Sequence, residues 1–272
     1  QDLDFSLQDV AGAKELHELG KAFEQMRGTL QETLIREWRS EQERREMVAA
    51  ITHDLRTPLT IIQGHVEGLI HGGSKQLDRL ERYLQTIYAN TERAIHLLEE
   101  MTELSEIERT DFKLLPAEAD IAVFVSKKIE EFSVLCEQKR IAFQSTFEDS
   151  RKQSRPMILD AHRLNRMVDN VMAKSMRFTP EGGTIEWHTS VTEGKVAFTV
   201  TDSGPGFSEK DLRQMFQRFY QGDPSRSTEK GHAGLGVSIV RTLTEKHGGG
   251  IEADNVAGGG ARIRLWVQEL DL

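Results

Sequence analysis

Two long apolar seams constrain the fold of this chain more than any other feature. The first steps by three or four positions through Ile51, Leu55, Leu59, Ile62, Val66 and Leu69. The second runs through Leu77, Leu80, Leu84, Ile87, Ala94, Leu98 and Met101 and ends near Arg109. This spacing predicts two amphipathic helices, each with one buried seam. Two antiparallel helices with narrow seams cannot close a core alone, so we expect two chains to join as a homodimeric four-helix bundle.

The segments that flank these helices also read as helical. Leu19, Phe23, Met26 and Leu30 predict a coiled-coil-like helix before them, although an ordinary amphipathic helix explains the spacing equally well. The charged run at residues 39–46 interrupts the apolar pattern and is most simply a solvated helical stretch. Residues 71–74 (His-Gly-Gly-Ser) predict the end of one helix and the cap of the next.

A mixed pattern begins after residue 110. Turn residues and changes of periodicity predict helices at 121–136, 161–177 and 237–247, and strands at 141–147, 157–159, 184–191, 195–201, 250–255 and 261–267. The elements do not alternate as regular βαβ units, which argues against a doubly wound parallel sheet. The predicted fold class is therefore α plus α/β: a helical hairpin in a dimeric bundle, followed by an α/β sandwich.

Composition narrows the classes of function. The chain has 272 residues, 38% of them hydrophobic and 29% charged, which is typical of a folded protein. Its formal charge of −9 argues against a broad nucleic-acid-binding face. The single cysteine, Cys136, fits a reducing, cytoplasmic setting, and no apolar run is long enough to span a membrane.

His53 is the first candidate for chemistry. An imidazole can act as a nucleophile near neutral pH, and Asp54 beside it could hold one ring nitrogen so that the other is free to attack. Pro58 lacks an N–H group and strains the helix five residues later. The alternative is a surface histidine on a coiled-coil helix with a chance proline.

Two glycine-rich motifs are candidates for a nucleotide site. The run Asp202-Ser-Gly204-Pro-Gly206 directly follows a predicted strand, where it could also be a simple turn. The run Gly231-His-Ala-Gly234-Leu235-Gly236 opens a predicted helix. Glycines at such a helix start let backbone N–H groups and the helix dipole approach a phosphate. Each motif alone is a weak signal.

Together these motifs resemble the sequence boxes of sensor histidine kinases. His53-Asp-Leu-Arg-Thr-Pro-Leu59 resembles the H-box, in which the histidine receives the γ-phosphoryl group of ATP. Residues 163–170, continuing to Phe178-Thr-Pro180, resemble the N-box, and Phe216-Gln-Arg218-Phe219 resembles the F-box between the two glycine boxes. Five boxes in the expected order do not assemble by chance, so the chain is identified as a member of this family.

The resemblance implies a Bergerat ATP-binding fold. In this family the aspartate matching Asp202 accepts a hydrogen bond from the adenine amino group, which selects adenine over guanine. Gly204 and Gly206 would allow close backbone approach, and Phe178 would lie near the nucleotide. Arg177 and Arg218 would meet phosphate oxygens. The glycine box Gly231, Gly234, Leu235 and Gly236 would bind phosphates, and residues 221–233 would form the mobile lid over them.

Lys174 departs from the family pattern. The N-box has two asparagines four positions apart, of which the second is the principal Mg²⁺ ligand; Asn170 matches the first, but Lys174 fills the second position. An ammonium group only donates hydrogen bonds and repels a metal ion. Lys174 is therefore either a natural or engineered loss that cripples metal binding, or a partial substitute for the metal. The loss is favoured because one fixed charge cannot bridge two phosphates.

The resemblance also implies domains and partners. Residues 4–7 and 15–26 are similar to part of a HAMP linker, which implies a parent protein at the cell membrane with this part in the cytoplasm. The predicted domains are a partial HAMP-like helix (1–38), a dimerisation and phosphotransfer domain (39–110) and an ATP-binding domain (111–272). The expected partners are a second copy of the chain and the receiver domain of a response regulator.

The sequence thus predicts a sensor histidine kinase in which His53 accepts the phosphoryl group of ATP. Thr57 lies one helical turn after His53, where its hydroxyl could orient a water for a phosphatase reaction, or could simply bond to the backbone. The main alternative is a nucleotide-binding signalling module that is catalytically impaired because of Lys174. A third reading, an ATP-hydrolysing member of the same fold without phosphohistidine, is disfavoured by the H-box.

Overall fold

The computed structural model describes residues 14–72, 77–109, 111–220 and 234–271. Contacts divide the chain into two units, Gln1–Thr52 and His53–Leu272, and each is considered by itself. Residues 73 and 74 of the turn expected at 71–74 lie outside the described residues, as do the segment 221–233 and Gly231 within it. None of the described helices combines the length and the apolarity that crossing a bilayer requires.

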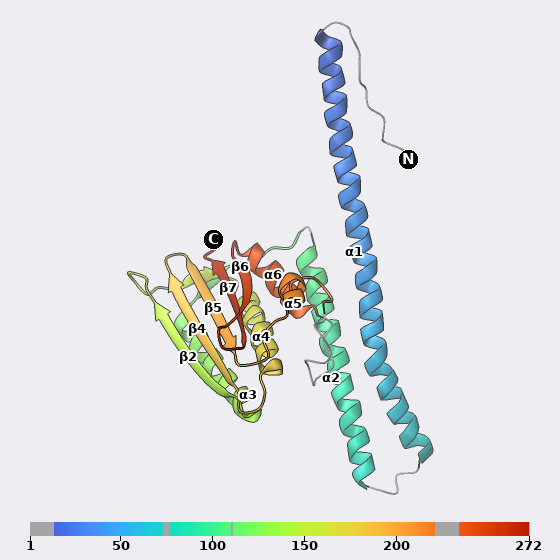
Figure 1. Cartoon of the computed structure of the whole chain (residues 1–272), viewed down its shortest axis with the longest axis vertical. Coiled ribbons are helices and arrows are strands. Elements are labelled where there is room, and N and C mark those ends of the chain that lie inside the picture. The colour runs from blue at the N-terminus through green and yellow to red at the C-terminus, as the bar shows by residue number, and fades with distance from the viewer. Residues whose placement is uncertain (1–13, 73–76, 110, 221–233, 272) are drawn as a thin grey trace. The chain divides into compact units, whose positions relative to one another are not determined.

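Helix α1 spans Lys14–Gly72 without a break (Figure 1). The sequence predicted two patterned segments joined by a charged stretch, and the structure makes all three one helix. Pro58 is buried within it, and the helix continues past the proline. In the first unit Leu19, Met26 and Trp38 remain largely exposed. The apolar seam predicted there is therefore not covered within this unit.

The second unit begins with a helical hairpin formed by the end of α1 and by α2 (Leu77–Glu108). A close contact fixes how these two helices pack. A Cβ atom on Gly68 would come within 2.9 Å of the Tyr83 ring, so only glycine admits this ring without a shift. The His65 ring meets the same tyrosine edge to face, at 4.8 Å between centroids. The predicted hairpin is confirmed.

The rest of the unit is an α/β sandwich built on a five-stranded sheet of order β2-β4-β5-β7-β6. Its strands are β2 (Ala142–Asp149), β4 (Thr184–Thr192), β5 (Lys195–Asp202), β6 (Gly250–Asn255) and β7 (Ala261–Gln268). Only β2 and β4 pair in parallel. This mixed sheet confirms the prediction against a doubly wound fold.

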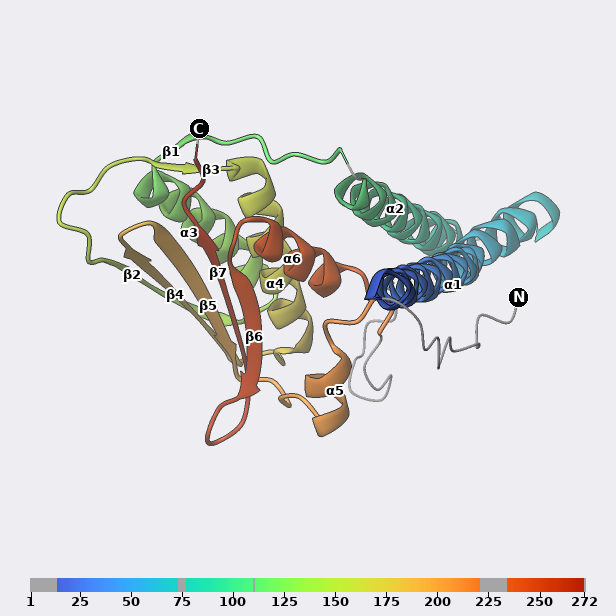
Figure 2. The same ribbon diagram turned by 90° about the horizontal axis from the view of Figure 1, so that it is seen from above.

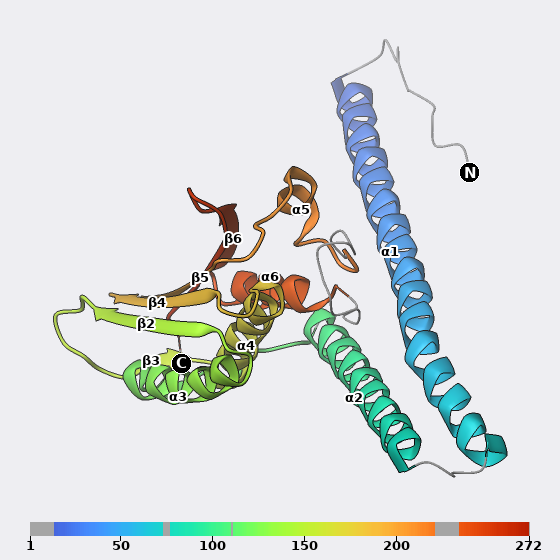
Figure 3. The same ribbon diagram turned by 60° about the horizontal axis from the view of Figure 1, so that its bottom comes forward.

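Three helices cover one face of the sheet, namely α3 (Ile121–Gln138), α4 (Ala161–Phe178) and α6 (Gly236–Lys246) (Figures 2 and 3). Two short elements were not predicted. The first is strand β1 (Ala117–Ala119), which pairs with β3 (Met157–Leu159). The second is the short helix α5 (Glu209–Gln214), whose N-terminus is capped by Ser208 in a capping box. Both are too short to give a periodic signal in the sequence.

An aromatic cluster forms the centre of the core between sheet and helices. Trp187 on β4 packs edge to face on Phe132 of α3, with 5.4 Å between ring centroids, and is stacked on Phe198 of β5 at 6.1 Å. All three side chains are fully buried. Trp187 alternates with more exposed neighbours along β4, as the two-residue period of a strand requires, whereas on β5 the neighbour of Phe198, Ala197, is also buried.

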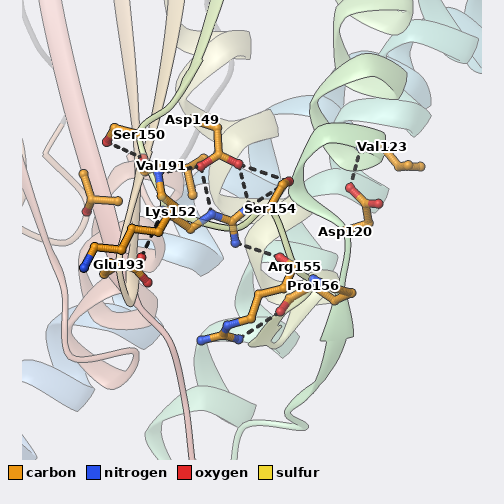
Figure 4. Close-up of polar contacts among 12 residues, drawn as sticks. Asp120, Val123, Asp149, Ser150, Lys152, Ser154, Arg155, Pro156, Val191 and Glu193 are labelled. Carbon is orange, nitrogen blue, oxygen red and sulfur yellow. Dashed lines mark hydrogen bonds and ion pairs between the residues drawn. The ribbon is translucent and has the colours of Figure 1, made fainter.

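The connection from β2 to β3 is held by polar contacts (Figure 4). Arg151 donates two hydrogen bonds to the carboxylate of Asp149, at 2.9 and 2.7 Å, and a third at 2.7 Å to the carbonyl of Arg155. The bidentate pair lowers the pKa of Asp149 to about 2. The backbone N–H of Lys152 also donates to Glu193 in the β4–β5 turn. Polar contacts thus hold the β2–β3 connection beside that turn.

Candidate active site

His53 presents its ring on the surface of α1. The ring is 78% exposed, and its Nδ1 lies 3.1 Å from Oδ1 of Asp54. This is the contact that the sequence suggested for holding one ring nitrogen. When Nδ1 carries the proton and donates it to the carboxylate, the Nε2 atom bears the free lone pair. The arrangement exposes one nucleophilic nitrogen to an incoming group.

Thr57 follows His53 by one helical turn. Its hydroxyl donates to the carbonyl oxygen of His53 at 3.5 Å. This backbone contact is the alternative considered for Thr57 in the sequence. At 3.5 Å the bond is at the outer limit of hydrogen-bond geometry, so releasing the hydroxyl costs little. The side chain is exposed on the same stretch of helix as His53.

Asp202 ends β5, in the centre of the sheet. It pairs in register with Ile185 of β4 and Ala261 of β7, and its residue is only 6% exposed. Burial raises the pKa of the Asp202 carboxyl, while backbone N–H groups of Gly204 (2.9 Å) and Ala261 (3.4 Å) donate to Oδ1 and act in the opposite direction. Both backbone donors share Oδ1, and the Ser175 side chain also lowers the pKa of this carboxyl.

The two glycines after Asp202 are required by the protein itself. A Cβ atom on Gly204 would lie 2.8 Å from the carbonyl oxygen of Phe178, and Gly206 has a φ of +70°. Asn255 was missed by the sequence reasoning. Its side chain accepts from Phe207 N–H at 2.7 Å and donates to Phe207 C=O at 2.8 Å, which clamps this loop. The resemblance assigned Gly204 and Gly206 to close approach by a nucleotide, but these glycines also allow close contacts within the protein itself.

Helix α4 lines the site with one face. Asp160 caps its N-terminus by accepting from Arg163 N–H, and its opposite face is buried against the sheet. Asn170, Lys174 and Phe178 are four positions apart and so share a face. Asn170 is at the end nearest α6, where its Oδ1 is 3.2 Å from the position of a Cβ on Gly236. Phe178 is at the end nearest Gly204.

Lys174 lies between these two ends. Its Nζ atom is 5.2 Å from the centroid of the Phe178 ring and 5.8 Å from that of Phe207. Burial, and next the charge of Arg177, lower the pKa of Lys174 from 10.5 to about 8, against the opposing pull of Asp211 and Asp202. The side chain thus carries a poorly solvated charge into the site.

The remaining predicted residues are placed as follows. Arg177 has its guanidinium carbon 4.7 Å from the Phe178 ring centroid. Gly234 has a φ of +71°, and a Cβ there would meet the carbonyl oxygen of Tyr220 at 2.5 Å, so residues on either side of segment 221–233 touch. Leu235 is fully buried and precedes the first turn of α6. Tyr220 donates to buried Asp211 at 2.9 Å.

Acidic residues of α2 contact basic residues of the α/β part. Arg166 donates to Glu103 at 2.7 Å, Arg163 pairs with Glu106 at 2.9 Å, and Arg218 pairs with Glu108. Arg218, expected at phosphate oxygens, is therefore engaged with α2 in this conformation. The three-residue spacing of Glu100, Glu103 and Glu106 was a signal in the sequence that could have pointed to this contact.

Glu100 of α2 lies against the start of α6. Its Oε1 is 3.5 Å from the position of a Cβ on Gly236, and 3.4 Å from Nε2 of His96. The hydrogen bond to Glu100 raises the pKa of His96, although burial opposes this. A buried carboxylate thus lies beside the first turn of α6, where the sequence places phosphate binding.

The residues present do not fit the Mg²⁺ ion that the fold implies. Mg²⁺ is held by oxygen ligands in octahedral geometry. Asn170 offers one amide oxygen, and Lys174 offers none. The Lys174 ammonium also repels a cation at the position where the family has its principal metal ligand.

Comparison with known families identifies both parts of the site. The model described as "His Kinase A (phospho-acceptor) domain" matches residues 43–110, and that described as "Histidine kinase-, DNA gyrase B-, and HSP90-like ATPase" matches residues 159–271. The fold and the site thus define a phosphoacceptor hairpin that is followed in the chain by an ATP-binding domain of this ATPase class.

Individual relatives agree. Sensor histidine kinase WalK of Bacillus subtilis is 32% identical over 225 residues, which cover 82% of this chain and 36% of WalK. Sensor histidine kinase SpaK of Bacillus subtilis is 28% identical, with 98% of this chain and 56% of SpaK covered. The chain thus spans between about a third and just over half the length of these relatives. It belongs to the sensor histidine kinases, as its sequence boxes predicted.

Solved structures share the fold. Histidine kinase AdeS of Acinetobacter baumannii has a TM-score of 0.60 at 22% identity, covering 80% of this chain and 98% of AdeS. Histidine kinase ThkA, solved in complex with response regulator protein TrrA, has a TM-score of 0.65 at 22% identity, covering 83% of this chain and 61% of ThkA. These likenesses confirm the predicted fold class.

Proposed function

We propose that this chain is an ATP-dependent histidine kinase whose phosphoacceptor is His53. The observation that carries the proposal is the exposed His53 ring with Nδ1 held by Asp54, on the same chain as an ATPase-type site. The domain divisions at residues 39 and 111 remain part of the proposal. So do the roles given to Asp202, Arg177, Phe178 and the glycine boxes.

The chemistry follows from the protonation of the imidazole. The Nε2 lone pair attacks the γ-phosphorus of ATP in line, the new N–P bond forms as the bond to the bridging oxygen breaks, and ADP leaves. The imidazole then carries a phosphoryl group on Nε2 and a proton on Nδ1, so it gains positive charge. The carboxylate of Asp54, 3.1 Å from Nδ1, stabilises that charge.

At the nucleotide site, Asp202 is proposed to accept the adenine amino group through a carboxylate oxygen. A buried acceptor facing the carbonyl of guanine would be left unpaired, which gives the selectivity for adenine. Phe178 and Phe207 present ring faces to Lys174 and are proposed to contact the nucleotide. The start of α6, at Leu235 and Gly236, supplies N–H groups for phosphate oxygens.

The phosphoryl group is proposed to pass from His53 to an aspartate of a response-regulator receiver domain. The structure of ThkA with TrrA shows that a kinase of this fold forms such a complex. Thr57, exposed one turn beyond His53, is proposed to orient water for the reverse, phosphatase reaction. Its long backbone contact leaves the hydroxyl available for this role.

The functional unit is proposed to be a homodimer. In the second unit, Leu59 and Ile70 of α1 and Leu84 and Tyr88 of α2 are between 52% and 70% exposed. Apolar side chains of this size at helical spacing need a partner surface. A second copy of the hairpin, presenting the same residues, would complete a four-helix bundle.

Lys174 favours a second candidate function. In this reading the chain is a nucleotide-binding signalling module with impaired phosphoryl transfer, because the expected metal ligand is missing. Incubation with γ-labelled ATP tests the choice. Label that is lost in acid but kept in base indicates phosphohistidine and supports the kinase. Nucleotide binding without any label supports the second candidate.

A further inference from the structure

The site must neutralise the negative charge of the nucleotide's phosphates, and Lys174, near Arg177 on α4, is a cation placed to do so. Its side chain is half-buried on the face of α4 that lines the site. Arg218 is already paired with Glu108. A kinase site of this kind acts almost entirely by positioning and by stabilising charge. The source of positive charge therefore decides which form of the nucleotide is bound.

Lys174 has no direct anionic partner within the described part of the chain. No carboxylate there forms an ion pair with its Nζ atom, and Asp202 and Asp211 act on it only at longer range. The Phe178 and Phe207 rings, 5.2 and 5.8 Å away, replace water on two sides. Keeping a charge so poorly solvated is costly unless an anion arrives. The arrangement is that of a cation prepared for an anionic ligand.

The position of Lys174 on α4 lets its charge serve the phosphates. Asn170, one turn earlier on the same face, lies against the start of α6, and Phe178, one turn later, lies against Gly204 beside Asp202. The position of Lys174 on α4 is thus between these two ends, and its ammonium lies beside the Phe178 and Phe207 rings at the adenine end. Its flexible four-carbon stem can swing along this face toward the phosphates.

The same residue excludes an effective metal site. It fills the position of the expected oxygen ligand and adds a positive charge that repels Mg²⁺. What remains, the amide oxygen of Asn170, is a single neutral ligand. A divalent ion bound to the nucleotide would have only this one neutral protein ligand and would gain a like-charged neighbour.

We propose that the Lys174 ammonium takes the place of the divalent cation, so that this chain binds its adenine nucleotide as the metal-free polyphosphate. This inference rests on the proposed function of the site. It differs from the simple loss that the sequence favoured, because Lys174 contributes to binding instead of only removing a ligand.

Calorimetric titration of the full chain tests the proposal, with ATP in EDTA and ATP with Mg²⁺. The native chain should bind ATP in EDTA within about threefold of its affinity in Mg²⁺. Lys174→Gln, which keeps a similar length but removes the charge, should bind ATP in EDTA at least tenfold more weakly. Lys174→Arg should retain binding in EDTA. Lys174→Asn should bind ATP tightly only with Mg²⁺.

Adenosine is the matched control because it lacks phosphates, so Lys174→Gln should bind it as the native chain does. The proposal is overturned if Mg²⁺ strengthens native ATP binding tenfold or more, or if Lys174→Gln binds ATP in EDTA as well as the native chain. In both cases the kinase assignment stands. If the native chain binds neither ATP nor adenosine, the proposed function fails together with this inference. Urea unfolding of each variant verifies that it is folded.

Discussion

The phosphoacceptor region and the nucleotide region of this chain are built in opposite ways. His53 is exposed on a helix surface, and its polar partner Asp54 is the next residue. Asp202 is buried, and one of its hydrogen-bond donors, Ala261, is 59 positions away in the sequence. The phosphoacceptor site is therefore formed by adjacent residues and needs only a helix. The nucleotide site needs the register of three strands, and it is also the region that departs from the family, at Lys174.

The largest effect is expected from substituting His53, which should affect the phosphoacceptor region and leave the nucleotide region unchanged. His53→Gln should abolish acid-labile, base-stable label from γ-labelled ATP, because no other group is proposed to receive it, while ATP affinity measured by calorimetry stays unchanged. His71→Gln is the matched control, since His71 is exposed on the same helix and its ring nitrogen contacts a backbone carbonyl. Label that persists in His53→Gln would rule out His53 as the acceptor.

Thr57→Ala should separate two activities of the phosphoacceptor region, namely the phosphatase reaction and the phosphorylation of His53. We expect dephosphorylation of a phosphorylated response regulator to fall tenfold or more, about 1.4 kcal/mol in the barrier, because the water loses its orienting hydroxyl. Phosphorylation of His53 should remain, since the imidazole attack does not use Thr57. Thr60→Ala, at another exposed threonine of α1, serves as the control. Equal loss of both activities would indicate a damaged helix instead.

Asp202→Asn tests the buried region. The substitution keeps the size but replaces a carboxylate oxygen with an amide donor facing the adenine amino group. We expect ATP binding to weaken by roughly 1–3 kcal/mol in calorimetry. Asp254→Asn, at an exposed residue of β6 paired with Arg262, should leave the affinity unchanged. If Asp202→Asn is folded and binds ATP like the native chain, the adenine contact is wrong.

The last prediction concerns the pH dependence of stability. The folded-state pKa of Lys174 is about 8, below its ordinary value of 10.5, so between these values the unfolded chain binds more protons than the folded chain. The free energy of unfolding should therefore rise with pH across this window, by at most ~1.4 kcal/mol per pH unit from this group. Urea unfolding of the native chain and Lys174→Gln at pH 8, 9 and 10 measures the difference. Equal pH slopes would contradict a desolvated lysine.

The sequence by itself determined the helical hairpin, the longer strands and helices of the sandwich, and the identity of His53 and Asp54 as neighbours. These features repeat every two, three or four residues, and such short periods are set by local backbone geometry. The shared face of Asn170, Lys174 and Phe178 followed from the same rule. The family boxes likewise lie within short continuous segments, so they could be recognised before any fold was known.

Only the tertiary structure decided which distant residues meet. The clamp of Asn255 on Phe207, the pairing of Arg166 with Glu103 and the place of Lys174 between two aromatic rings join segments tens of positions apart. Strand β1 and helix α5 also escaped prediction, since contacts with other segments stabilise them more than their own few residues do. Such contacts depend on strand register and helix packing, which periodicity does not specify. This is why the sequence could place Lys174 at a metal position but not show what surrounds its charge.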